Sequence, residues 1–162
     1  MGIPKANKIY YFAYGSNCNL EQMARRCPKA KKVGAVTLNG YKLTFNGKYS
    51  GTGVANIKRK KGAIVNGLMW EITQECEKSL DIYEGFPHLY TKKTVTVKTA
   101  DGTEIEAMVY VMTSKYNTPA LPSQAYYWGI RDGFIENGID PHTLQVALTE
   151  TYNAIQMESE VI

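Results

Sequence analysis

The order of the secondary-structure signals along this chain constrains its fold more than any single motif does. Strand-forming segments dominate the chain up to Met112, and the segments after Ser123 have helical periodicity. The sequence lacks the strand–helix–strand alternation that builds a doubly wound parallel sheet. We therefore expect an α+β fold with a mainly antiparallel sheet or barrel.

The expected strands are short runs rich in β-branched and aromatic residues, bounded by turn signals. They cover residues 9–13, 32–38, 41–45, 54–58, 64–72, 90–99 and 104–112. Asp101 and Gly102 separate the last two strands, and Asp-Gly is a strong signal for a tight hairpin turn. The basic run Lys58–Lys61, followed by Gly62, predicts a solvated hairpin connection between the fourth and fifth strands.

The expected helices begin at typical capping residues. Asn19, Thr73 and Ser123 each precede a segment of helical spacing. A fourth helix is expected to begin at Asp140 and Pro141, because proline suits the first helical turn. With their caps included, the helices cover residues 19–26, 73–83, 123–138 and 140–156.

Length and composition predict one globular domain, which we take to span residues 1–162. Apolar residues make up 44% of the chain and charged residues 21%, a balance that supports a buried core rather than disorder. No segment approaches the ~18 consecutive apolar residues of a membrane span. Residues 1–8 lack the apolar stretch of a secretory signal. We therefore expect a cytoplasmic protein without a membrane partner.

The net charge and the spacing of the cysteines limit the partners and metals that we expect this protein to bind. The net charge of +4 comes from one short run, because the basic and acidic residues balance without Lys58–Lys61. A nucleic-acid partner is therefore not expected. Cys18, Cys27 and Cys76 have no spacing typical of a zinc site. We expect three free thiols in a reducing compartment, with neither a disulfide nor a metal.

The segment Tyr14–Asn17 is the first candidate for a functional site. It turns the chain between a strand and a capped helix, and Gly15 tolerates backbone angles that other residues resist. Such a turn can direct several N–H groups toward an anion, but an ordinary strand-to-helix turn has the same sequence. The segment matches neither a Walker loop nor a dinucleotide-binding fingerprint.

Glu84 is the second candidate, as a general base. It lies at the end of a helix, directly before Gly85, and the spacing of Leu80 and Tyr83 predicts a buried face on that helix. The negative end of a helix and apolar neighbours both raise a carboxyl pKa toward the range that suits proton transfer near neutral pH. A solvated glutamate is the alternative interpretation, and Asp81 is either a second carboxylate of the site or a solvated one.

The third candidate is the segment from Pro122 to Trp128. Ser123 is expected to cap a helix, whereas Tyr126 or Tyr127 either fills the core or directs its hydroxyl into a pocket. No Ser–His–Asp or Cys–His set is evident, since His88 and His142 are isolated. The sequence therefore predicts no covalent nucleophile.

Three motifs occur together in a characteristic order. They are Tyr11–Asn17, the segment Leu80–Gly85 followed by Tyr90, and Pro122 with Ser123 followed by Tyr126. In order and spacing, over roughly residues 9–140, they resemble the γ-glutamylcyclotransferase family of the AIG2-like superfamily. Cys18 departs from the family pattern, which usually has leucine at this position.

The resemblance implies a small, mixed and mainly antiparallel β-barrel flanked by helices. It also implies an enzyme that converts a γ-glutamyl peptide or amide to 5-oxoproline and releases the amino acid or amine. Glu84 falls on the family's proton acceptor. The implied substrate-binding residues are Tyr11, Phe12, Ala13, Tyr14, Gly15, Ser16, Asn17, Tyr90 and Tyr126. The implied partner is a small γ-glutamyl substrate, with no cofactor, and a homodimer is expected.

Two alternatives stay open. One is a related cyclotransferase that acts on a γ-glutamylamine or on a γ-glutamyl-protected metabolite. The other is a non-catalytic protein that binds a small ligand or a partner through the same pocket. Glu84 favours an enzyme, because a pure binding protein has no need of a base.

Overall fold

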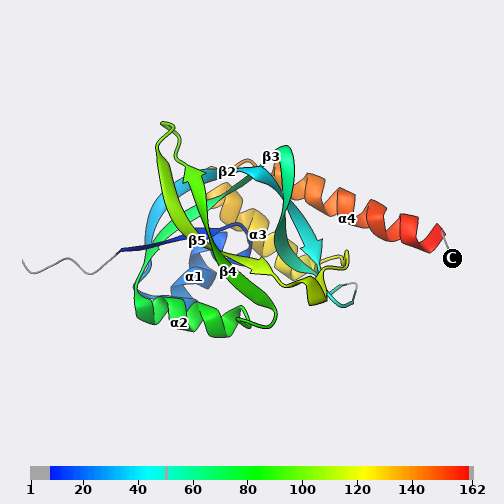
Figure 1. Cartoon of the computed structure of the whole chain (residues 1–162), viewed down its shortest axis with the longest axis horizontal. Helices are drawn as coiled ribbons and strands as arrows, with labels where there is room; N and C mark the ends of the chain where they lie inside the picture. Colours follow the sequence, from blue (N-terminus) through cyan, green and yellow to red (C-terminus); the bar gives the residue numbers. More distant parts are fainter. Residues whose placement is uncertain (1–7, 50, 161–162) are drawn as a thin grey trace, which may run out of the picture.

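Five strands closed into a barrel form the centre of the molecule, and the helices lie around it (Figure 1). The computed structural model describes residues 8–49 and 51–160. The strands follow one another around the barrel in the order β1–β3–β2–β4–β5. β1 pairs with β5 in parallel, and the other neighbouring pairs are antiparallel. The expected α+β fold with a mixed, mainly antiparallel barrel is therefore confirmed.

The bounds of the elements follow the sequence signals closely at most ends. The strands are β1 (Ile9–Ala13), β2 (Lys31–Asn46), β3 (Val54–Ile72), β4 (Tyr90–Lys98) and β5 (Glu104–Met112). The helices are α1 (Leu20–Arg26), α2 (Gln74–Tyr83), α3 (Gln124–Glu136) and α4 (His142–Glu160), with the short 3-10 helices η1 (Ser16–Cys18) and η2 (Ser114–Tyr116).

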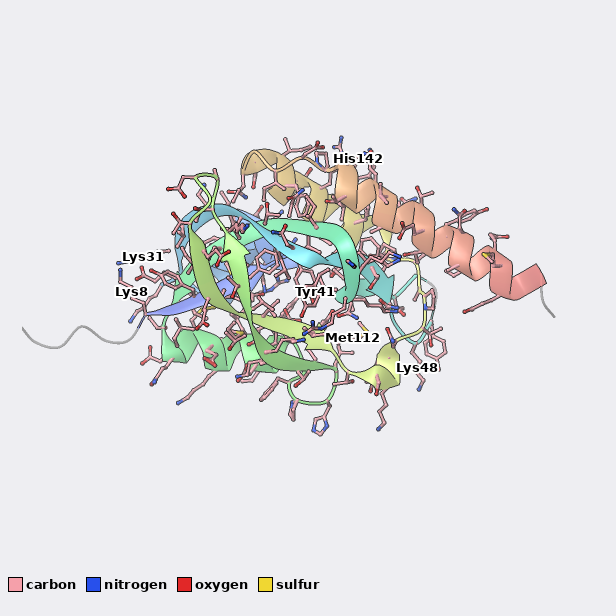
Figure 2. All side chains as sticks on the ribbon, turned by 45° about the horizontal axis from the view of Figure 1, so that its top comes forward. Lys8, Lys31, Tyr41, Lys48, Met112 and His142 are labelled. Atoms are coloured by element: carbon pink, nitrogen blue, oxygen red, sulfur yellow. A yellow bond between two sulfur atoms is a disulfide. The ribbon has the colours of Figure 1, made fainter. Side chains whose placement is uncertain are left out.

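The predicted helix caps are present. The side chains of Asn19, Thr73 and Ser123 each accept a hydrogen bond from the backbone N–H three residues later. Figure 2 marks His142 at the start of α4, which extends past the barrel, and it marks Lys8 and Lys31 at the opposite end of the molecule. Within the described residues, no helix combines the length and the apolar character that crossing a bilayer requires.

β2 and β3 are each one long strand where the sequence predicts two. Their pairing shifts register beside Gly40, where this single residue of β2 opposes residues 60–63 of β3. Gly40 and Gly62 have φ angles of 81° and 83°, a region that favours glycine. The extra residues are thus absorbed as a bulge and neither strand ends. The hairpin connection predicted at Lys58–Lys61 is therefore wrong.

Apolar side chains from every strand and from the packed helices form one core. The largest of those that are fully buried are Phe12, Phe45, Ile57, Val65, Leu68, Met69 and Val97 in the strands, and Met23, Leu80, Ile130, Phe134 and Leu144 in the helices. Burying a side chain of this size stabilises the fold by about 1.5–3 kcal/mol. The interior of the barrel is therefore filled with side chains, and it gives the loops at the rim a rigid support.

The structure contains one disulfide, between Cys27 and Cys76. Cys27 follows the last residue of α1, and Cys76 lies in the first turn of α2. The bond therefore connects the two helices through cysteines that are 49 residues apart in the chain. Cys18 is a buried free thiol. The expectation of three free thiols is wrong, because packing of α1 against α2 brings together two cysteines that have no sequence pattern in common. The disulfide also removes one reason for expecting a reducing compartment.

Close contact between α3 and η1 depends on a glycine. A Cβ atom at Gly133 would lie 2.6 Å from the backbone carbonyl carbon and oxygen of Cys18. The absence of a side chain thus lets α3 rest directly on the chain that follows the Tyr14–Asn17 turn. Asn137, at the end of α3, adds a hydrogen bond from its side-chain amide to the same Cys18 oxygen, at 3.0 Å.

Thiol counting tests the disulfide directly. Protein that is purified and unfolded without reductant should contain one titratable thiol, that of Cys18, because Cys27 and Cys76 are joined. After reduction, all three cysteines should react. A Cys27→Ser/Cys76→Ser double variant serves as the control, with one thiol before and after reduction. Three thiols in unreduced wild-type protein would contradict the bond.

A methyl group at Gly133 should force α3 away from η1. Gly133→Ala should lower the free energy of unfolding by about 1–3 kcal/mol, because the added carbon overlaps backbone atoms that cannot move aside. Gly129→Ala is the matched control on the same helix, since its Cβ would meet only the end of the Gln22 side chain. Urea denaturation of both variants makes the comparison. Equal stability of the two would disprove the close contact at Gly133.

Candidate active site

A cavity of about 180 Å³ opens where the end of β1, the end of α2 and the start of α3 meet. It brings together residues from distant parts of the chain, with tyrosines as the most frequent type. Its lining consists of Tyr11, Tyr14, Gly15, Ser16, Asn17, Val54, Ala55, Tyr83, Glu84, Leu89, Tyr90, Tyr110 and Tyr126. Glu84 and most of the predicted substrate-binding residues therefore share one cavity.

The turn after β1 presents backbone donors at this cavity. The N–H groups of Gly15, Ser16 and Asn17 donate to no acceptor among residues 8–49 and 51–160, although all three residues line the cavity. Gly15 has a φ of −122°, so left-handed backbone is not the reason for glycine here. The reason is a close approach, because a Cβ atom would lie 3.1 Å from the Ala55 methyl and 3.5 Å from the Tyr126 hydroxyl.

Asn17 is held on several sides. Its side-chain amide donates to the Tyr11 hydroxyl at 2.9 Å and, at 3.5 Å, to the Glu84 carboxylate. Its side-chain oxygen accepts from Arg26 at 2.6 Å, and its backbone oxygen accepts from the Trp70 indole at 2.9 Å. These contacts fix the turn and direct the amide toward Glu84.

Glu84 is the residue directly after α2. Its N–H donates to the Leu80 carbonyl, and Gly85, with a φ of 64°, ends the helix. Burial raises the pKa of the Glu84 carboxyl to about 7, while the nearby positive charge of Arg26 opposes the rise. The upward direction agrees with the sequence prediction, and burial is its main cause. A carboxyl group with this pKa can exchange a proton near neutral pH.

Two tyrosines contact the same residue of β3. The Tyr90 hydroxyl donates to the Ala55 carbonyl at 2.5 Å, and the Ala55 N–H donates to the Tyr126 hydroxyl at 2.9 Å. The hydrogen of Tyr90 is therefore committed, whereas that of Tyr126 meets no acceptor in the part of the chain that the structure describes. Burial raises the pKa of both phenols, and both are neutral near neutral pH. Tyr126 is thus a hydrogen-bond donor available to a ligand.

Phe12 and Ala13 do not line the cavity, although the family resemblance implies that they bind substrate. Phe12 is fully buried, and its ring lies 6.2 Å from that of Tyr14. Ala13 is also buried, and its carbonyl accepts a hydrogen bond from the Cys18 thiol. Because side chains alternate along a strand, Tyr11 faces the cavity and Phe12 faces the core. Phe12 therefore supports the site by packing, whereas alternation puts Ala13 on the side of Tyr11, where it is buried under other residues.

Sequence reasoning missed two tyrosines of the cavity. Tyr83 was expected on the buried face of α2, but its side chain is 45% exposed and its hydroxyl lies 3.2 Å from the Ser16 hydroxyl. Tyr110 comes from β5, and no local motif marks it. Because Tyr11 pairs with Met108 of β5 and side chains alternate along the strand, Tyr110 lies on the same face as Tyr11.

Asp81 lies behind the cavity rather than in it. Its carboxylate accepts a hydrogen bond from the Tyr110 hydroxyl at 2.6 Å and pairs with Lys92 at 3.0 Å. It therefore orients a cavity tyrosine, a role that neither sequence interpretation contained. Among the described residues, no three His, Cys, Asp or Glu side chains are grouped so that they could hold a metal ion.

Comparison with known proteins agrees with this arrangement. A family model described as gamma-glutamyl cyclotransferase, AIG2-like, matches residues 11–128. The gamma-glutamylcyclotransferase of Bos taurus is 38% identical over 136 residues, which cover 80% of this chain and 71% of the relative. That of Homo sapiens is 36% identical over 143 residues, with 84% and 75% covered. A solved gamma-glutamyl cyclotransferase has a TM-score of 0.77 at 35% identity, covering 88% of this chain and 87% of its own.

The matched segment contains the Tyr14–Asn17 turn, Glu84 and Tyr126, so it includes every side of the cavity. The match to the family model spans well over half of the chain, and the relatives exceed 30% identity over most of their length. The protein is thus an enzyme and belongs to the gamma-glutamyl cyclotransferase, AIG2-like, family.

Proposed function

We propose that this enzyme cyclises the γ-glutamyl group of a γ-glutamyl peptide or amide to 5-oxoproline and releases the amino acid or amine. The observation that carries the proposal is the position of Glu84, whose carboxyl shares a small cavity with uncommitted backbone donors of the Tyr14–Asn17 turn. A base and a set of donors are the two things that such a cyclisation requires. The family of the chain supports the same activity.

The substrate itself supplies both reacting groups, its α-amino nitrogen and its γ-carbonyl carbon. Glu84 takes a proton from the α-ammonium group, and the resulting amine attacks the carbonyl carbon to form the new C–N bond. The attack leaves two hydrogens and a positive charge on the ring nitrogen. The bond to the leaving nitrogen breaks as Glu84 gives its proton to that nitrogen, and Glu84 then takes the surplus proton of the ring nitrogen and passes it to the released amine, which leaves as an ammonium ion. Glu84 is thereby returned to its starting state. Holding the chain folded gives the attack the large advantage of an intramolecular reaction.

The donors of the turn and of α3 would stabilise negative charge on oxygen. The N–H groups of Gly15, Ser16 and Asn17 and the free hydroxyl hydrogen of Tyr126 are available for the γ-carbonyl oxygen and the α-carboxylate. Removing one such donor costs about 10²–10³-fold in turnover in other enzymes. No covalent residue is needed, in line with the sequence prediction.

The size of the cavity bears on the substrate class. About 180 Å³ suits a group of side-chain size rather than a whole peptide. We therefore infer that the γ-glutamyl group lies inside, while the leaving amine lies at the rim beside the half-exposed Tyr83. The enzyme would then recognise the γ-glutamyl group more strictly than the leaving group.

Replacing Glu84 by glutamine should lower 5-oxoproline formation by about 10²–10⁴-fold. Glutamine keeps the shape of the glutamate side chain but cannot accept the proton. The assay measures 5-oxoproline and free amine released from a set of γ-glutamyl peptides and γ-glutamyl amines. Glu75→Gln, an exposed change on the same helix, is the control and should keep full activity. Full turnover by Glu84→Gln would remove the mechanism, and indifference of the wild type to every compound would remove the proposed function.

The pH dependence of kcat/KM should have an acidic limb near pH 7. Glu84 must be ionised to accept a proton, and burial raises the pKa of its carboxyl to about 7, so activity should fall by about tenfold per pH unit below that value. The folded-state pKa also lies above the ordinary 4.5, so the stability that protonated Glu84 contributes is lost as the pH rises through about 7. As the pH rises from 4.5 to about 7, Glu84→Gln should therefore gain stability relative to the wild type. Thermal unfolding at several pH values measures this difference. A limb at pH 4.5 would mean that Glu84 is solvated.

A further inference from the structure

Arg26 lies outside the cavity and yet contacts three groups that belong to its wall. One terminal nitrogen donates to the Ser16 hydroxyl at 3.0 Å and to the Asn17 side-chain oxygen at 2.6 Å. The other donates to the Gln22 side chain at 2.9 Å. The guanidinium group also stacks on the ring of Tyr83, 3.6 Å from its centroid. A single cation therefore connects the turn after β1 with the end of α2.

We propose that Arg26 is a positioning residue for Glu84: it holds the Asn17 amide and the Tyr83 ring in place and supplies the positive charge that favours the base form of the carboxylate. This inference rests on the proposed function for its consequence in turnover. Its physical content, a coupling between Arg26 and Glu84, can be measured without turnover.

The first part of the coupling is the orientation of Asn17. Because Arg26 donates to the side-chain oxygen of Asn17, the NH₂ group must face the other way, toward Tyr11 and Glu84. Without the guanidinium group, the amide loses its charged partner and can turn over. Lysine would restore the charge but not the planar fork that bonds and stacks at the same time.

The second part is electrostatic. The positive charge of Arg26 lowers the pKa of Glu84 and opposes the effect of burial. The other titratable groups that face Glu84 are phenols of high pKa, which carry no charge near neutral pH; they are Tyr11, Tyr14, Tyr90, Tyr110 and Tyr126. The nearby pair of Asp81 and Lys92 is salt-bridged behind Tyr110. The positive charge of Arg26 thus lowers the pKa of Glu84, which burial raises, toward neutral pH.

The third part is the anchoring of Arg26 itself. It is the last residue of α1, and the next residue, Cys27, is joined to Cys76 of α2. The helix that carries Arg26 and the helix that ends at Glu84 are therefore covalently connected close to the cation. The bond lies in the first turn of α2, whereas Glu84 follows its last turn, so the disulfide holds α2 as a whole beside the helix that carries the cation.

The experiment compares Arg26→Gln, Arg26→Lys and the matched control Arg25→Gln. Arg25 is the neighbouring residue, is exposed, and pairs only with Glu21 among the described residues. Two quantities are measured: the pH profile of kcat/KM, and the titration of the Glu84 carboxyl by carbon NMR in glutamate-labelled protein, with Glu84→Gln identifying the signal. Circular dichroism checks that each variant is folded.

Arg26→Gln should move both the acidic limb and the carboxyl midpoint upward, by about one pH unit. It should also lower the plateau of kcat by about 10- to 100-fold, since the turn is no longer held. Arg26→Lys should keep the Glu84 midpoint near that of the wild type, and only its plateau of kcat should be lower. Arg25→Gln should match the wild type in both measurements.

Two results would overturn the inference. The first is an unmoved Glu84 midpoint in Arg26→Gln, with activity reduced equally at every pH, as a purely structural role would give. The second is full activity of Arg26→Lys, which would show that the fork has no positioning role. If Arg26→Gln does not fold, the lysine variant still decides the positioning part. If the wild type releases no 5-oxoproline, the carboxyl titration alone decides the coupling.

Discussion

The hydrogen bonds of the Asn17 side chain are the interaction on which the site depends. A buried amide that lacks a partner costs about 1–3 kcal/mol, so each contact of Asn17 constrains the groups around it. Arg26 satisfies the oxygen end and Tyr11 the nitrogen end, which leaves the amide beside Glu84. The turn after β1 and the end of α2 are 67 residues apart in the chain, yet they meet through this side chain and through the hydroxyls of Ser16 and Tyr83.

The barrel makes that meeting possible. β1 is a strand of five residues that pairs with β3 on one side and with β5 on the other, so the turn that follows it is fixed at the rim. Helix α3 closes the same rim, because Gly133 allows it to rest on the Cys18 backbone. The fold thereby places the Glu84 carboxyl, whose pKa burial raises, in the cavity beside the turn. The rest of the core must supply the stability that a half-buried glutamate reduces.

Local patterns in the sequence predicted much of this structure, and the failures have a common physical origin. The caps at Asn19, Thr73 and Ser123 are signalled by neighbouring residues, and they are confirmed. The merging of strands around Gly40 was missed because it depends on how β2 pairs with β3, which neighbouring residues alone do not signal. The Cys27–Cys76 bond was missed for the same reason.

The residues of the site also divide into those that a local motif marks and those that only tertiary contacts bring in. The turn and Glu84 belong to local motifs, whereas Arg26 and Tyr110 enter the site through tertiary contacts. Phe12 was assigned to the substrate loop by resemblance, although the two-residue period of a strand directs it away from Tyr11. Strand alternation separates Phe12 from Tyr11, but it puts Ala13 on the same face as Tyr11, so the position of Ala13 outside the cavity could not be predicted from the motif alone.

The close approach of Gly15 to Ala55 limits the size of the side chains that these two positions can hold together. The Ala55 methyl and the place of a missing side chain at Gly15 are 3.1 Å apart, and both residues line the cavity. Enlarging either residue would fill part of the cavity and would disturb the two tyrosines bonded to the Ala55 backbone. These two positions share the same space, so a larger residue at one of them leaves too little room for the residue at the other.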